Sequence, residues 1–233
     1  MLDFGYYNMD CMKGMAEFPD RYFDLAIVDP PYGIGVGSIA YTNGVQVVGN
    51  ALAKRRDYSG HKEWDNAIPD KAYFSELFRI SKNQVIWGGN YFTEYLKPTK
   101  SWIVWDKRCD EKYRNSFADC ELAWTNKGVA RVFRYLYNGM IQENMKNKEE
   151  RIHPTQKPVA LYKWLLSNYA KEGDLILDTH AGSASSLIAC EDMGFKYVAF
   201  ELDEIYYKES LERLNNHKAQ ISIMDILQDW RAH

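Results

Sequence analysis

The chain has 233 residues, of which 46% are hydrophobic, and its 29 Lys and Arg against 32 Asp and Glu give a net charge of −3. This composition is that of a globular protein and excludes a disordered tail, a collagen and a coiled coil. The mildly acidic balance argues against a protein that coats nucleic acid without selectivity, because such proteins carry a large positive excess.

The first half of the chain alternates apolar runs with polar segments. Residues 22–28 form an apolar run that ends at Asp29-Pro30-Pro31-Tyr32, which predicts a buried strand stopped by prolines. Residues 33–67 have weak periodicity and six of the 15 glycines, so we expect a long mobile loop with a functional role. Residues 68–82 are predicted to form a helix and residues 84–87 a strand.

The second half predicts a regular alternation of strands and helices. Three strands are expected first, at residues 101–106, 120–125 and 129–137, the last two joined as an antiparallel hairpin by the turn at 126–128. A helix (158–171), a strand (175–177), a helix (185–193), a strand (197–200) and a helix (204–217) follow. Strands alternating with helices predict a doubly wound, mostly parallel α/β sheet, in a single domain over residues 1–233.

Nothing in the sequence indicates a membrane or a metal. No apolar run approaches the roughly 20 residues that span a bilayer, and the chain does not start with a basic, then apolar, leader. The four cysteines form no Cys-x-x-Cys pair, and the five histidines show no ligand spacing. We therefore expect a cytoplasmic protein that binds no metal.

The segment after the strand at 175–177 has the features of a nucleoside site. An acid, Asp178, is followed by small residues up to Ser185, which allow a ligand to approach the backbone at the carboxyl end of a strand. Glu201 follows the next strand 23 residues later, a spacing at which an acid reaches a ribose diol. The glycine signatures for dinucleotides and for nucleoside triphosphates are absent, which favours a nucleoside without a pyrophosphate. The alternative is that Gly182 forms a tight turn and Glu201 a solvated helix start.

Asp29-Pro30-Pro31-Tyr32 is predicted to lie at the same edge of the sheet. The two prolines remove two backbone donors, so that Asp29 and the carbonyl of Pro30 are available as acceptors beside the flat ring of Tyr32. Two acceptors and an aromatic plane can hold an exocyclic amino group and leave its lone pair free. The alternative is a proline-terminated strand with a packing tyrosine.

Together these motifs resemble the amino-group (adenine-N6 or cytosine-N4) DNA methyltransferases that use S-adenosylmethionine. Asp29–Tyr32 is similar to the family's catalytic Asp-Pro-Pro-Tyr, residues 178–185 to its cofactor loop, and residues 153–158 (HPTQKP) to the motif that helps close the cofactor pocket. The catalytic motif precedes the cofactor loop, which is the permuted order of the beta class. The resemblance implies a class I methyltransferase fold in that order.

The resemblance also implies a site. Asp29, Pro30, Pro31 and Tyr32 would be catalytic, with Tyr32 stacking on a base flipped out of the duplex. The cofactor ligands would be Asp10, Cys11, Asp29, Thr155, Lys157, Pro158, Asp178, Thr179, His180, Ala181, Gly182, Ser183, Glu201 and Leu202. Adenine is the expected base, because Asp at the first motif position resembles adenine-N6 enzymes.

Two residues of the cofactor loop differ from the family's pattern. Ala184 replaces a glycine and is expected to add a methyl group where the backbone approaches the methionine part of the cofactor. His180 replaces a phenylalanine, either as a stacking ring, which we favour, or as a polar contact or a pH-sensitive group.

Double-stranded DNA is the expected partner. The candidate DNA-binding residues are Lys54, Arg55, Arg56, Lys107 and Arg108. Only residues 138–152 remain for the recognition insertion, so base reading is expected from the 33–67 loop, from a second protomer of a homodimer, or to be weak. The resemblance implies a bacterial or phage-encoded type of protein, of the kind found in restriction-modification systems.

Three alternatives to an adenine-N6 DNA methyltransferase stay open. The enzyme could instead act on the N4 amino group of cytosine in DNA. It could act on RNA or on a glutamine amide, although those enzymes usually carry the cofactor loop before the catalytic motif. Finally, the chain could be a non-catalytic DNA-binding or regulatory relative with a weakened cofactor site.

Overall fold

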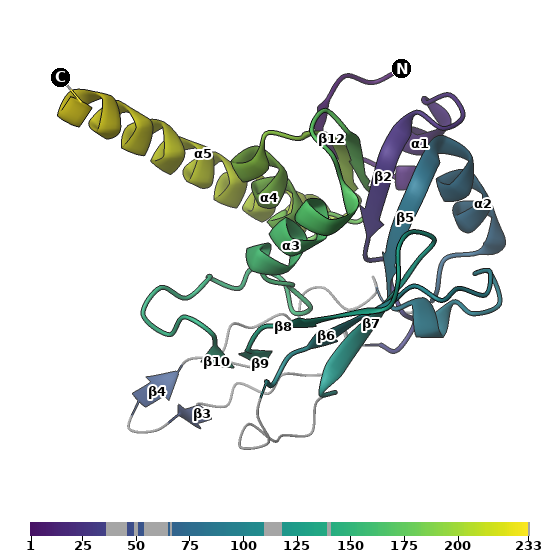
Figure 1. The fold of residues 1–233 in the computed structure, drawn as a ribbon, viewed down its shortest axis with the longest axis horizontal. Helices are drawn as coiled ribbons and strands as arrows, with labels where there is room; N and C mark the ends of the chain where they lie inside the picture. Colours follow the sequence, from purple (N-terminus) through teal and green to yellow (C-terminus); the bar gives the residue numbers. More distant parts are fainter. Residues whose placement is uncertain are drawn as a thin grey trace.

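The computed structural model describes residues 1–35, 46–48, 51–53, 65, 67–109, 118–138 and 141–232. Within these residues eight strands form one sheet in the order β1-β12-β11-β2-β5-β7-β6-β8 (Figure 1). Their bounds are β1 Gly5–Asn8, β12 Lys196–Glu201, β11 Leu175–Asp178, β2 Phe23–Val28, β5 Ser81–Trp87, β7 Cys120–Thr125, β6 Trp102–Asp106 and β8 Arg131–Arg134. Two short antiparallel pairs complete the strands, β3 (Gln46–Val48) with β4 (Ala51–Ala53) and β9 (Tyr137–Asn138) with β10 (Ile141–Gln142).

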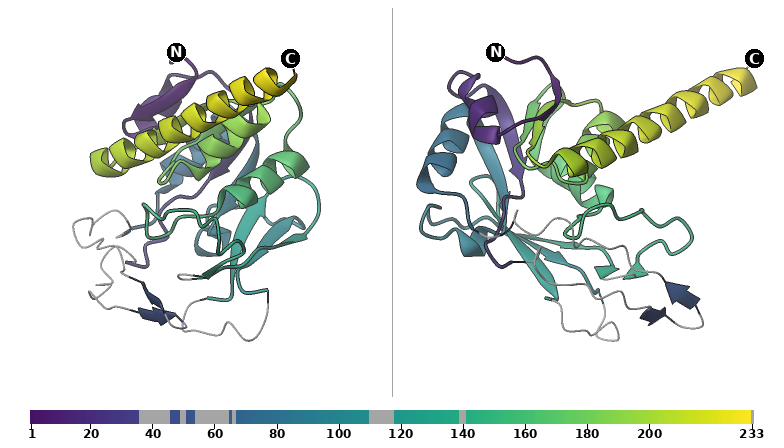
Figure 2. Two further views of the ribbon diagram at one scale, coloured as in Figure 1. Left: turned by 90° about the vertical axis from the view of Figure 1, so that its left-hand side faces the viewer. Right: turned by 180° about the vertical axis from the view of Figure 1, so that it is seen from behind.

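Helices cover both faces of the sheet. The first face carries α1 (Cys11–Ala16) and α2 (Lys71–Ile80), and the second carries α3 (Val159–Tyr169), α4 (Ser185–Met193) and α5 (Glu204–Ala232). In Figures 1 and 2 the yellow, C-terminal part of α5 extends beyond the body of the domain. The predicted doubly wound α/β fold is therefore confirmed.

Strand β2 shows how one apolar run serves two cores. Leu25 and Ile27 pack into the cluster beneath α3 and α4, whereas Phe23, Ala26 and Val28 pack into the cluster beneath α1 and α2. All five side chains are at most 2% exposed. A strand buried on both faces reads as a continuous apolar run, which is why its sequence predicts it well.

Capping residues set the helix boundaries. Asp10 accepts the backbone N–H of Met12 at 2.7 Å, and Asp70 accepts that of Tyr73 at 3.0 Å, so each acid caps a helix N-terminus. Pro158 precedes α3 as predicted, and Gly194 ends α4 in the left-handed conformation with φ of 73°. These caps fix where α1, α2 and α4 begin or end at the edges of the sheet.

The predicted hairpin between residues 120–125 and 129–137 is wrong. Strand β8 pairs in parallel with β6, and β7 pairs antiparallel with both β5 and β6, so β6 lies between β7 and β8. The Asn126-Lys127-Gly128 segment does reverse the chain, but it leads β8 past β7 to the far side of β6. A turn signal predicts a change of direction and does not say which strand will be the neighbour.

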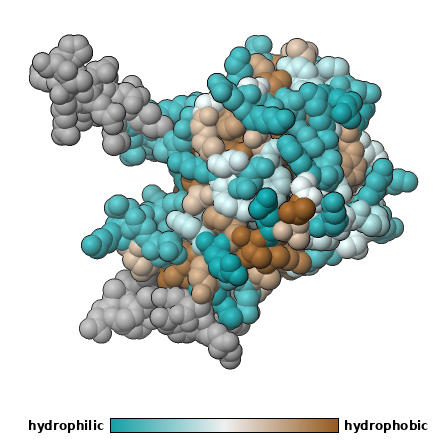
Figure 3. Space-filling view, in the orientation of Figure 1, coloured by the Kyte–Doolittle hydropathy of each residue, from teal (hydrophilic) through white to brown (hydrophobic). Residues whose placement is uncertain are grey.

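Strands β1, β12, β11, β2 and β5 run in parallel, so their carboxyl ends meet at one edge. The helices change face between β11 and β2, which is the topological switch point where ligands bind in open α/β sheets. Within the described residues, no helix has the length and apolar character to cross a membrane. Figure 3 shows polar, teal side chains over most of one face, with apolar, brown residues gathered below its centre.

Candidate active site

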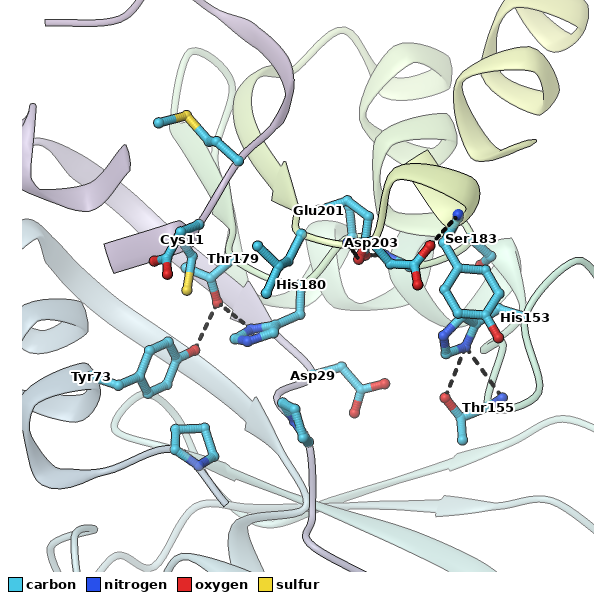
Figure 4. A pocket seen from close by; sticks show the side chains of 18 of the residues that line it. Cys11, Asp29, Tyr73, His153, Thr155, Thr179, His180, Ser183, Glu201 and Asp203 are labelled. Atoms are coloured by element: carbon cyan, nitrogen blue, oxygen red, sulfur yellow. Dashed lines mark hydrogen bonds between the residues drawn. The ribbon is translucent and has the colours of Figure 1, made fainter. Parts of the chain in front are cut away.

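A cavity of about 630 Å³ lies at this carboxyl edge (Figure 4). Its walls come from segments far apart in the sequence, namely residues 9–12, Asp29 and Pro31, residues 67–70 with Tyr73, part of the 153–157 segment with Tyr162, residues 179–183, and residues 201–203 with Tyr206. The predicted catalytic motif and cofactor loop therefore face one common space. Its volume is in the range of small-molecule and cofactor sites.

Glu201 holds the cofactor loop in place. Its Oε2 accepts the backbone N–H of Gly182 at 2.8 Å, and its Oε1 accepts that of Asp203 at 2.9 Å. Burial raises the pKa of Glu201, and the two backbone donors act in the opposite direction. Each oxygen of an ionised carboxylate has a second acceptor position, so a diol in the cavity would still find an acceptor there.

Asp178 lies behind the wall and does not line the cavity. Its Oδ1 accepts the backbone N–H of His180 at 3.0 Å, and its Oδ2 accepts the hydroxyl of Ser186 at 2.5 Å. Burial raises the pKa of Asp178 to about 7. Asp178 thus shapes the loop that a cofactor would touch.

His180 faces the cavity as part of a short polar chain. Its Nδ1 lies 2.9 Å from Oγ1 of Thr179, which lies 2.7 Å from the hydroxyl of Tyr73, and its ring meets that of Tyr73 edge-on at 5.5 Å (Figure 4). Burial lowers the pKa of His180 to about 4. The ring is therefore neutral near pH 7, where it combines an aromatic contact with a polar one, and it takes up a proton only in more acidic solution.

The catalytic corner is a cluster of charges around Asp29. The Tyr32 hydroxyl donates to Oδ1 of Asp29 at 2.5 Å, and the Lys157 ammonium donates to Oδ2. Nζ of Lys157 also lies 3.2 Å from Oε2 of Glu121, whose Oε1 accepts from Lys107 at 3.0 Å. Both oxygens of Asp29 thus have donors, and a polar substrate would replace one of them.

Tyr32 is held from several sides. Its ring stacks on that of Tyr91 at 5.0 Å with an interplanar angle of 16°. Gly88, with φ of +70°, packs so closely that a Cβ there would lie 2.2 Å from the Tyr32 ring. Oδ1 of Asp65 accepts the backbone N–H of Tyr32 at 2.7 Å and that of Gly33 at 2.9 Å. Burial, and to a lesser extent the charge of Asp29, raise the pKa of Tyr32. Tyr32 therefore stays a neutral phenol whose hydroxyl donates a hydrogen bond to Asp29.

The 153–158 motif closes the cavity opposite α2. The ring of His153 meets that of Tyr206 at 4.3 Å, and its Nδ1 lies 3.1 Å from Oγ1 of Thr155. On α5, Arg213 donates to the carbonyl of Ser183 at 2.7 Å and to Glu149 at 3.0 Å. These contacts tie the motif and the base of α5 to the cofactor loop.

Most predicted site residues line the cavity. They are Asp10, Cys11, Asp29, Pro31, Thr155, Lys157, Thr179, His180, Ala181, Gly182, Ser183, Glu201 and Leu202. Pro30, Tyr32, Pro158 and Asp178 lie outside its wall. The sequence reasoning missed Tyr73 and Glu121. The Asp70 cap, which fixes the first turn of α2, is the signal that could have indicated Tyr73, whereas no local pattern marks Glu121.

Ala184 does not occupy the place that its substitution suggests. The expectation that its methyl group faces the cofactor is wrong, because Ala184 is fully buried in the core cluster with Leu187 and does not line the cavity. Its φ of 58° is the left-handed conformation that normally favours glycine. The change from glycine to Ala184 therefore affects the backbone conformation of the turn before α4 and not the wall of the cavity.

The candidate DNA-binding residues are only partly described. Lys107 pairs with Glu121, and Arg108 pairs with Asp119 at 2.8 Å; the two basic side chains are 14% and 16% exposed. Contact of these two residues with phosphate stays a prediction. Lys54, Arg55 and Arg56 and the predicted loop conformation lie outside the described residues, apart from the short strands β3 and β4. Across the described part of the chain, no group of three or more His, Cys, Asp or Glu is placed to hold a metal ion.

The fold and site define a class of α/β protein with a nucleoside-sized cavity at the switch point and an acidic, aromatic motif beside it. The family model N6_N4_Mtase, described as DNA methylase, matches residues 90–212. The chain belongs to this family of DNA amino-methyltransferases, as its motifs predict. The match contains the 153–158 motif and the cofactor loop, whereas Asp29–Tyr32 lies before it.

Two methylases align with nearly the whole of this chain. YubD of Escherichia coli (strain K12) is 26% identical over 88% of this chain and 87% of its own length. The type II methyltransferase M2.DpnII of Streptococcus pneumoniae is 21% identical over 90% of this chain and 91% of its own.

Solved structures share the fold. TTHA0409 of Thermus thermophilus, complexed with S-adenosyl-L-methionine, has a TM-score of 0.57 and 17% identity over 92% of this chain and 94% of its own. The PvuII DNA methyltransferase, described as cytosine-N4-specific, has a TM-score of 0.56 and 14% identity over 93% and 92%. The class I methyltransferase fold predicted from the motifs is thereby confirmed.

Proposed function

We propose that this protein transfers a methyl group from S-adenosylmethionine to the N6 amino group of a flipped adenine in double-stranded DNA. One observation carries the proposal. Asp29 lies at the carboxyl end of β2 and faces the same cavity as the 179–183 loop and Glu201, so an amino group and a nucleoside cofactor would meet there.

The residues around the cavity fit S-adenosylmethionine. Glu201 offers acceptors for a ribose diol, and residues 9–12 with Leu202 form the wall beside it, where we place the adenine ring of the cofactor. Residues 179–183 give a small-residue surface for the methionine part, with Thr155 opposite. When bound, the cofactor supplies an electrophilic methyl group, so the protein needs to position the nucleophile and no covalent catalyst.

Asp29 and Tyr32 are proposed to hold that nucleophile. The carboxylate of Asp29 and the Pro30 carbonyl would accept hydrogen bonds from the amino group, which keeps the nitrogen lone pair directed at the methyl group. Tyr32 stacks on Tyr91, whose side chain is 42% exposed. The Tyr32 ring would leave this contact and stack on the flipped base instead.

Adenine is favoured over cytosine by Asp at the first position of the catalytic motif. The likeness to the cytosine-N4-specific PvuII enzyme is a likeness of fold and leaves cytosine as the second candidate. Specificity for one DNA sequence is proposed to come from the 33–67 segment or a second protomer, because the 138–152 segment is too short for a separate recognition domain.

The test is transfer of tritium from S-adenosylmethionine to duplex DNA, RNA and protein side by side. We expect labelled DNA only, and loss of transfer in Asp29→Ala and Asp29→Asn while circular dichroism shows that both variants keep the native fold. Asp20→Asn is the matched control, because the Asp20 side chain is 75% exposed and pairs with Arg79 on the surface. Unchanged transfer in both Asp29 variants would overturn the proposed role of the motif.

Calorimetry addresses the non-catalytic alternative. We expect S-adenosylmethionine to bind the isolated protein, since the Ala184 methyl group does not enter the cavity. Absence of binding at millimolar cofactor would favour a regulatory relative.

A further inference from the structure

Lys157 is the most deeply buried charge at the catalytic corner. Its side chain is 2% exposed, and its Nζ donates to Oδ2 of Asp29 and lies 3.2 Å from both Oε2 of Glu121 and the hydroxyl of Tyr32. The carboxylates are less buried, with 17% of Asp29 and 27% of Glu121 exposed. The ammonium group of Lys157 is therefore less accessible to solvent than either carboxylate.

The cluster is electrically balanced. In their ionised forms Asp29 and Glu121 contribute two negative charges, and Lys157 and Lys107 contribute two positive ones, joined in the order Asp29–Lys157–Glu121–Lys107. Burial raises the pKa of Asp29, and the neighbouring Lys157 ammonium acts against that shift. Burial opposes a charged lysine, yet the pKa of Lys157 is raised because two carboxylates outweigh the loss of water. A buried ammonium with two anionic partners can lose one of them without losing its charge.

We propose that Lys157 is a positioning residue that keeps the Asp29 carboxylate ionised and oriented for the target amino group, with Glu121 as the second anchor that holds the lysine in place when Asp29 turns to its substrate. This rests on the proposed function. The family's pattern predicts Lys157 among the cofactor ligands, and the contacts instead direct its charge at Asp29.

The Lys157 ammonium is directed at Asp29 and not at the cofactor. Within the part of the chain that the structure describes, the polar contacts of the Lys157 Nζ atom go to the catalytic corner, namely Asp29, Tyr32 and Glu121. The reacting methyl group of S-adenosylmethionine is attached to a positive sulfonium, so a lysine directed at that end of the cofactor, and not at its carboxylate, would be repelled. The same charge beside Asp29 favours the carboxylate form that accepts hydrogen bonds from an amino group.

The direct test needs neither cofactor nor DNA. Titration of the Asp29 carboxyl carbon by ¹³C NMR, assigned with Asp29→Asn, reports its pKa in the free protein. In Lys157→Met that pKa should rise by about one unit or more, and Lys157→Arg should restore most of the shift. Lys163→Met is the matched control, because Lys163 on α3 pairs with Asp192 outside the site. An Asp29 pKa unchanged by Lys157→Met would overturn the proposal.

Glu121→Gln provides a variant of opposite sign. This substitution removes the negative charge of Glu121 from the neighbourhood of Asp29, so the pKa of Asp29 should fall. The amide of the glutamine can still accept a hydrogen bond from Lys157. This variant decides the question if Lys157→Met does not fold. A rise, or no change, in Glu121→Gln would contradict the charge order of the cluster.

Kinetics separates positioning from cofactor binding. Lys157→Met should lower kcat by about 100-fold or more, while the Kd for S-adenosylmethionine in calorimetry stays within about threefold. A Kd weakened by about tenfold with kcat near the wild-type value would make Lys157 a cofactor ligand and overturn the proposal. If the wild type methylates no DNA, the proposed function fails, and the NMR titration still judges the role of Lys157.

Discussion

His180 is expected to make the folded state sensitive to acid. Burial lowers its pKa from 6.5 to about 4, so the unfolded chain binds a proton in a pH range where the folded chain does not. The contribution of the neutral His180 ring to the free energy of unfolding is therefore fully present above pH 6.5 and is lost as pH falls toward 4. Between pH 7.5 and pH 5 the shift corresponds to a loss of about 2 kcal/mol, and it approaches about 3 kcal/mol below pH 4.

The informative variant is His180→Phe, with His180→Gln as a second variant that keeps a polar group. Both remove the titrating ring, so each should lose about 2 kcal/mol less than the wild type between pH 7.5 and pH 5. Urea unfolding at pH 5, 6 and 7.5 measures this as a difference of differences, in which the other titrating groups cancel. Phe keeps the aromatic contact with Tyr73, and Gln can keep the hydrogen bond to Thr179.

A loss of stability that is identical in the wild type and in both variants would disprove this role of the ring. It would mean that the ring titrates as it does in the unfolded chain, and hence that water reaches it. His180 would then not be a neutral ring that is shielded from water in the cavity wall and whose pKa is lowered by burial.

Three further predictions follow from the same edge of the sheet. Asp178 should affect the free energy of unfolding in the opposite direction, because its pKa is raised to about 7: its contribution is present below pH 3.8 and is lost as pH rises through 7. In urea unfolding the wild type should therefore lose about 2–3 kcal/mol from this group between pH 5 and pH 7.5, and Asp178→Asn should not show that loss. Gly88→Ala should abolish methyl transfer and should lower the free energy of unfolding more than Gly194→Ala does. Gly194 is the control because it shares the left-handed φ but has no atom within 4 Å of the added Cβ, so equal losses would contradict the close packing of Gly88 on Tyr32. Ala184→Gly should leave the Kd for S-adenosylmethionine within about twofold, and a large gain in affinity would mean that its methyl group does obstruct the cofactor.

Strands buried on both faces could be predicted from the sequence. The run that forms β2 is apolar at nearly every position because α1 and α2 cover one face and α3 and α4 the other. Helix α4 is predicted from Ser185 to Met193 with its glycine cap, and these are its observed bounds. Such elements are determined by local signals that tertiary contacts reinforce.

The order of strands could not be predicted in the same way. The turn at 126–128 has ordinary hairpin residues, yet β8 pairs with β6 and not with β7. The choice of partner depends on which edge remains free after β6 and β7 have paired. That information is distributed over three strands and is absent from the turn itself.

The candidate site shows the same division. Motifs predicted Asp29, the loop at 179–183 and Glu201, since the carboxyl ends of parallel strands must meet. Glu121 could not be predicted, because its relation to Lys157 arises only when β7 pairs beside β5 and the 153–158 motif folds over both. The charges that surround a catalytic acid are thus a property of the fold, although the acid is a property of the motif.

The central claim of the proposed function is methylation of adenine N6 in duplex DNA. Its most direct measurement is mass spectrometry of nucleosides released from duplex DNA after incubation with the protein and S-adenosylmethionine. We expect N6-methyldeoxyadenosine from the wild type and none from Asp29→Ala. N4-methyldeoxycytidine as the product, or methylated adenine from both proteins alike, would contradict the proposal.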